Sequence, residues 1–96
     1  MSNVETLRLG NEYDDDLRDA LAEVLTEMSG QKESSDWAMA GSQELQSVRL
    51  KVAGQALLVE SETYIGLTIT GEPSLIQDIA GRVDRSMKAA GRGSAR

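Results

Sequence analysis

The chain has 96 residues and a formal net charge of −6, which together indicate one small acidic domain. His and Cys are both absent, so imidazole chemistry, thiol chemistry and the common zinc sites are excluded. The negative charge argues against a protein that neutralises phosphates, so no direct nucleic-acid binding is expected.

The first predicted elements are a short strand over residues 4–9 (VETLRL) and an amphipathic helix over residues 14–28. Asn11 or Asp14 can cap the start of the helix, and residues 29–30 (SG) end it. The apolar stripe of this helix contains Leu17, Leu21, Val24, Leu25 and Met28, with Tyr13 and Ala20 at its edges.

The segment after this helix is predicted to be mostly loop. Residues 31–36 (QKESSD) are polar, and residues 37–40 (WAMA) form either a short strand or a tuck against the core. Trp37, the single tryptophan, has two interpretations. It is a buried core residue or an exposed anchor at an interface, because Trp is enriched at binding hot spots.

Three strands are predicted between residues 47 and 70. Alternation over residues 47–52 marks the first, and a three-residue loop at 53–55 and a two-residue turn at 61–62 separate the others. This spacing places seven residues on the core face: Val48, Leu50, Val52, Leu58, Ile65, Leu67 and Ile69. Leu57, Val59 and Tyr64 then lie on the opposite face, and dimerisation is one way to cover them.

A second helix is predicted to begin near Pro73, because proline is favourable in a first helical turn, and to end at Gly91. Its apolar stripe contains Leu75, Ile76, Ile79, Ala80, Val83 and Met87. The expected class is α+β, an antiparallel β-meander with two amphipathic helices in the order β-α-(β)-β-β-β-α. We expect residues 1–91 to form a single domain and residues 92–96 to be a disordered basic tail.

The start of the sequence, MSNVETLRLG, has no basic segment followed by an apolar run, so it does not resemble a signal peptide. No apolar segment approaches the roughly 20 residues that span a bilayer. We therefore expect a soluble, cytoplasmic protein without a membrane partner.

The acidic residues are concentrated at one end of the chain. Residues 1–31 contain eight acidic and two basic residues, whereas residues 32–96 contain eight of each, so the whole net charge belongs to the first third. On a helical wheel most of these acids lie opposite the apolar stripe: Glu12, Asp16, Asp19, Glu23 and Glu27. They are either a solvated helix face or an acidic docking face that a basic partner would neutralise.

Other polar groups have simpler explanations than chemistry. Residues 14–16 (DDD) complement the helix dipole and lack the alternating spacing of a calcium loop. Glu60 and Glu62 are a carboxylate pair at a predicted hairpin tip, without the apolar pocket that a catalytic acid needs. The sequence contains neither of the common glycine-rich nucleotide-binding motifs. We expect no catalytic residues, no cofactor and no metal.

We interpret the chain as a non-enzymatic protein-interaction module. Within that class, the first hypothesis is a small acidic inhibitor or immunity-type protein that occludes a basic surface of a protein partner. Its partner-binding residues would be Glu12, Asp16, Asp19, Glu23, Glu27 and Trp37. The alternative is a structural or assembly protein that homodimerises through its sheet, with acids that only keep it in solution.

Overall fold

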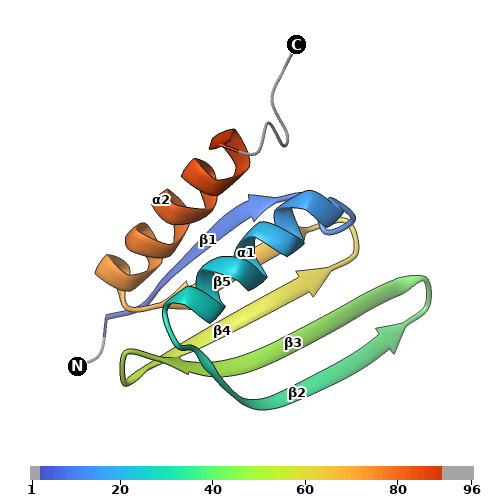
Figure 1. Cartoon of the computed structure of the whole chain (residues 1–96). Coiled ribbons are helices and arrows are strands. Elements are labelled where there is room, and N and C mark those ends of the chain that lie inside the picture. The colour runs from blue at the N-terminus through green and yellow to red at the C-terminus, as the bar shows by residue number, and fades with distance from the viewer. Residues whose placement is uncertain (1–2, 90–96) are drawn as a thin grey trace.

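A computed structural model describes residues 3–89 of the chain. The elements follow in the order β1 (Glu5–Gly10), α1 (Asp15–Glu27), β2 (Gln31–Ala40), β3 (Gln43–Val52), β4 (Gln55–Glu62), β5 (Gly66–Gly71) and α2 (Pro73–Ala89). The five strands form one antiparallel sheet, so the predicted α+β class is confirmed (Figure 1). The predicted end of α2 at Gly91 and the predicted tail at 92–96 lie outside the described residues.

The strand order across the sheet is β1-β5-β4-β3-β2. Strands β2 to β5 are a meander of consecutive hairpins, and β1 joins the far side of β5. Helix α1 carries the chain from β1 at one edge to β2 at the other, and α2 packs beside α1 on the same face of the sheet (Figure 1). The fold therefore has two layers, one of helices and one of strands.

Capping interactions within neighbouring residues define both ends of helix α1. The Asp14 carboxylate accepts a hydrogen bond from the backbone N–H of Leu17 at 3.1 Å, so Asp14 is the N-cap. The helix ends as Ser29 takes a positive φ of 58°, and the Gly30 N–H donates to the Leu25 carbonyl at 2.8 Å. The predicted start and stop of this helix are confirmed.

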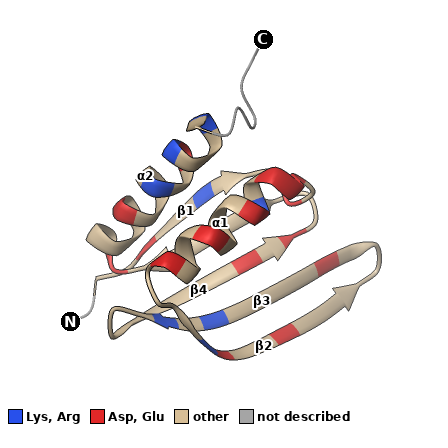
Figure 2. Cartoon of the chain, in the orientation of Figure 1, with Lys and Arg blue, Asp and Glu red and all other residues tan. Residues whose placement is uncertain are grey.

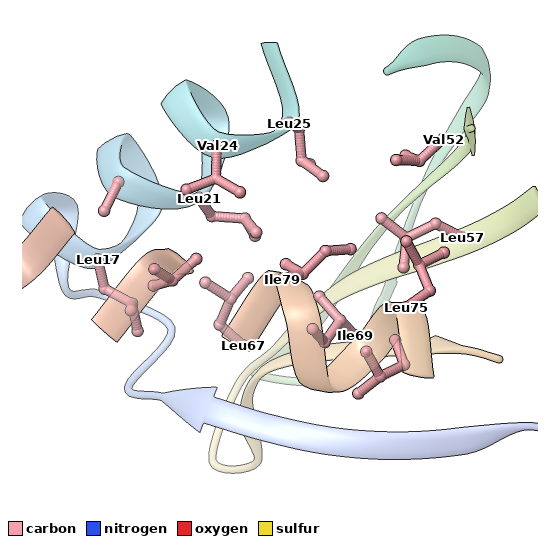
Figure 3. Close-up of a cluster of buried hydrophobic side chains, with 13 residues drawn as sticks. Leu17, Leu21, Val24, Leu25, Val52, Leu57, Leu67, Ile69, Leu75 and Ile79 are labelled. Atoms are coloured by element: carbon pink, nitrogen blue, oxygen red, sulfur yellow. The ribbon is translucent and has the colours of Figure 1, made fainter. Parts of the chain in front are cut away.

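The core lies between the helix pair and one face of the sheet (Figure 3). Ile69, Ile76 and Ile79 are fully buried at its centre. Thirteen apolar side chains form the buried cluster: Leu17, Ala20, Leu21, Val24, Leu25, Val52, Leu57, Leu67, Ile69, Leu75, Ile76, Ile79 and Val83. The helical stripes are largely as predicted, although Tyr13 is 70% exposed.

The predicted core face of β4 is wrong. Val52 pairs with Gln55, so the turn contains only Ala53 and Gly54, both with positive φ (53° and 77°). Because side chains alternate along a strand, a shift of one residue exchanges the two faces. Leu57 is therefore in the core at 2% exposure, whereas Leu58 lies on the outer face.

The next turn also differs from the prediction. Ser61 and Glu62 belong to β4, and the turn comprises residues 63–65. Ile65 is consequently 48% exposed instead of buried. The Thr63 hydroxyl accepts a hydrogen bond from the Glu44 backbone N–H at 2.9 Å, which holds this turn against the start of β3.

Residues 31–36 are not a loop, as predicted, but the first half of β2. The ten residues of β2 are all exposed, because this edge strand pairs only with β3 and no helix of the described chain lies over it. Without a buried face the strand needs no apolar alternation, so its sequence resembles that of a loop. A register shift between Lys32 and Ser34 adds a bulge.

Candidate functional site

The helices cover only part of the sheet. In the described part of the chain, α1 and α2 lie over β1, β5 and β4, and the same face of β3 and β2 extends beyond α1 (Figure 1). Residues paired across neighbouring strands lie on the same face of the sheet. Ile69 in the core pairs with Val59, Val59 pairs with Val48, and Val48 pairs with Ser35, so the core face of the sheet continues as far as β2. We call this uncovered surface the open face; it carries Ser35, Trp37, Met39, Glu44, Gln46, Val48 and Leu50.

Two large apolar side chains are exposed on the open face. Trp37 is 60% exposed and Met39 is 58% exposed, and they stand two residues apart on β2. The Trp37 indole N–H donates a hydrogen bond to the Glu44 carboxylate, which also accepts from the Gln46 amide at 3.2 Å. Trp37 is thus an exposed residue, oriented by a neighbour on β3, and the interpretation as a core residue is wrong.

An apolar groove of about 190 Å³ runs between α1 and the open face. Val48, Leu50 and Val59 form its floor, and Leu21, Ala22 and Leu25 of α1 form its wall. Arg18 marks one end, where its guanidinium donates to the Gln46 side-chain oxygen at 3.4 Å and to the Glu12 backbone oxygen at 3.2 Å.

The structure separates Glu12 from the other predicted docking residues. Helix α1 begins at Asp15, so Glu12 lies in the turn before it and is not on the helix face as predicted. Its side chain is 7% exposed, and its carboxylate accepts a hydrogen bond from the Tyr64 backbone N–H at 3.0 Å. Glu12 therefore ties this turn to the β4–β5 turn. The remaining predicted acids are exposed along α1: Asp16, Asp19, Glu23 and Glu27 (Figure 2).

The carboxylate pair Glu60 and Glu62 does not lie at a hairpin tip, as predicted, but within β4 on the outer face of the sheet. The Glu62 carboxylate accepts a hydrogen bond from the Gln43 amide at 2.8 Å. Over residues 3–89, no group of three or more acidic side chains is placed to hold a metal ion. Neither α1 nor α2, as described, has the length and apolar character to cross a membrane.

Comparisons of the chain with protein-family models, with curated proteins and with solved structures found no match. Sequence reasoning named Trp37 but missed Met39 and the groove residues Ala22 and Leu50. The alternation of Trp37 and Met39 with two alanines was the available signal for an apolar strand face.

Proposed function

We propose that this protein is a non-enzymatic protein-interaction module that binds a partner through the open face. The supporting observation is the exposure of Trp37 and Met39, at 60% and 58%, on a sheet surface beyond the helical layer. Exposed apolar patches of this kind mark interaction sites, and Trp supplies a large contact area at interfaces.

The proposed class of partner is a protein with a basic surface, which the module would occlude as a small inhibitor or immunity-type protein does. Asp16, Asp19, Glu23 and Glu27 are exposed on α1, the helix that borders the open face. Complementary charges of this kind increase the association rate more than the affinity. In this proposal the acids attract the partner and the apolar residues hold it.

The first test replaces the apolar anchor. The double variant Trp37→Ser/Met39→Ser is compared with the wild type for binding to the protein that co-purifies from the native cell, measured by surface plasmon resonance. Loss of a hot spot costs about 2 kcal/mol or more, so we expect the Kd to rise by roughly 30-fold. Val4→Ser is the control, because Val4 is 66% exposed next to β1 at the other edge. Equal losses in both variants would contradict the proposal.

The second test addresses the acids. Replacing the four exposed acids of α1 by their amides, in Asp16→Asn, Asp19→Asn, Glu23→Gln and Glu27→Gln, should leave the fold intact because these side chains lie outside the core. The association rate should fall at low salt and lose much of its dependence on ionic strength. An unchanged association rate at low salt would show that the acids only solvate the helix.

A second candidate function, homodimerisation through the sheet, is favoured by one observation. Strand β2 is a ten-residue edge, and residues 37–40 of it carry no charge that would oppose pairing with another strand. Sedimentation velocity over a concentration series tests this function. Dimers that dissociate on Ala38→Lys substitution and persist at high salt would favour assembly over binding of a basic partner.

A further inference from the structure

The groove lies between a helix flank and a sheet surface, and both of these are largely apolar where they line it. Its floor is a sheet surface with Val48 and Leu50 in consecutive inward positions on β3, and its wall is the flank of α1 around Ala22. Because the groove follows α1 from Arg18 to Leu25, a rod lying in it would run alongside α1. The helices α1 and α2 already pack side by side on this sheet in the same way.

The width of the uncovered sheet fits one helix. Neighbouring strands lie about 4.8 Å apart and a helix with its side chains is about 10 Å wide, so two strands offer room for one helix. The strands left beyond α1 are β3 and β2. Helix α1 itself has 13 residues. At about 1.5 Å per residue it is roughly 20 Å long, and the groove beside residues 18–25 is about half that length, so roughly two turns of an occupant would lie in it.

Charges of both signs border the groove: the Arg18 guanidinium is held at one end by Gln46 and the Glu12 backbone oxygen, and acids of α1 lie beside the wall. On a helical wheel, Asp15 and Asp19 lie about 20° and 60° from Ala22, so both carboxylates stand above the apolar wall. The ion pairs Arg82 with Asp78 and Lys88 with Asp84 lie within α2 and use neither Asp15 nor Asp19. A second copy of this chain would instead bring its own net charge of −6 towards these acids.

We propose that the groove between α1 and the open face seats an amphipathic, basic helix of the partner protein as a third member of the helical layer. The apolar stripe of that helix contacts Val48, Leu50 and Ala22, and its Lys and Arg residues lie near Asp15 and Asp19. This inference rests on the proposed function and adds the form and the chemistry of the partner segment.

The test uses a designed peptide as the probe. It has about four helical turns, with Leu at i, i+3, i+4 and i+7 spacing and Lys elsewhere. Binding to the full chain is measured by fluorescence anisotropy, against a peptide of the same composition in scrambled order. Ala22→Trp fills the groove from an exposed position, and Ala56→Trp adds the same bulk on the outer face of the sheet. We expect Ala22→Trp to weaken binding by about tenfold and Ala56→Trp by less than about twofold.

A charge comparison separates a specific site from general attraction between an acidic protein and a basic peptide. Asp15→Asn/Asp19→Asn and Asp78→Asn/Asp84→Asn change the net charge equally, but only the first pair borders the groove. We expect the first variant to bind the probe several-fold more weakly and with less dependence on salt. Equal effects of the two variants, or equal binding of the scrambled peptide, would overturn the inference.

The outcomes also separate this inference from the proposed function. If Ala22→Trp leaves the affinity for the probe peptide unchanged while binding of the native partner still requires Trp37 and Met39, the groove is not a helix site. The open face then remains the docking surface. If Ala22→Trp weakens binding of the probe peptide while replacing Trp37 and Met39 leaves the affinity for the native partner unchanged, the proposed function fails. Circular dichroism of each variant establishes that a loss of binding is not a loss of fold.

Discussion

Replacing Ile79 by Ala tests the core that positions the groove wall. Ile79 lies on α2, has 0% exposure and faces the sheet within the buried cluster (Figure 3). Three carbon atoms are removed, worth about 0.8 kcal/mol each in transfer, and the cavity left behind raises the expected cost to about 2–5 kcal/mol. A domain of this length is stable by roughly 5–14 kcal/mol, so the loss is a large fraction of the total.

The measurement is urea denaturation followed by far-UV circular dichroism, because Trp37 is 60% exposed and its fluorescence would report poorly on the core. A loss of about 3 kcal/mol corresponds to a fall in Tm of roughly 12–24 °C. Ile79→Val should cost only about 0.5–1.5 kcal/mol and gives the graded comparison. A loss below about 0.5 kcal/mol for Ile79→Ala would refute the placement of this side chain in the core.

Three further predictions concern single contacts. Glu12→Ala removes the acceptor for the Tyr64 N–H and should cost about 1–3 kcal/mol in urea denaturation, whereas Asp16→Ala should change stability by less than about 0.5 kcal/mol. The hydrogen bond from the Ser74 hydroxyl holds the pKa of the Glu72 carboxyl below its ordinary value of 4.5. The stabilisation of the fold by ionised Glu72 is therefore fully present above pH 4.5 and is lost as the pH falls through the pKa of Glu72 in the folded protein. In an NMR titration, Ser74→Ala should raise the pKa of Glu72. Gly66→Ala should destabilise by about 1–3 kcal/mol, because φ is 118° and the added Cβ would lie 2.5 Å from the Gly10 carbonyl oxygen. Gly54→Ala, with φ 77° but open space around it, should cost less in the same assay.

The helices could be predicted because each has one buried stripe. The 3.6-residue period of apolar residues in α1 and α2 reflects directly which side of each helix contacts the sheet. The capping group of Asp14 and the first-turn Pro73 are local features, so their positions could be read from neighbouring residues alone.

The strand register could not be predicted, because it depends on the geometry of turns that lack the usual turn residues. Ala53 takes a positive φ of 53°, a conformation for which Asn or Gly is the usual residue. Without that signal a three-residue loop was expected, and the single residue of difference exchanged Leu57 with Leu58 between the faces. Strand β2 was missed for another reason: both of its faces are exposed, so no buried side imposes a pattern.

The candidate site was only partly visible in the sequence. Trp37 could be identified as a candidate from its residue type alone. Four of the five predicted acids are exposed, but Glu12 is buried because the helix begins three residues later. The groove forms because β3 and β4 lie beside α1, which is a property of the sheet order and not of any local segment.

The pairing of β1 with β5 has a consequence for how the chain is synthesised. Thr6 and Thr70, whose hydroxyls lie 2.8 Å apart across this pair, are separated by 64 positions. At about 5–20 residues per second, a ribosome takes roughly 3–13 s to make β5 after β1. The hairpins β2–β3 and β3–β4 can close in that interval, but β1 has no strand to pair with until β5 has left the ribosome. A nascent chain released before residue 71 would therefore keep β1 unpaired, and α1 would lack part of the surface on which it packs.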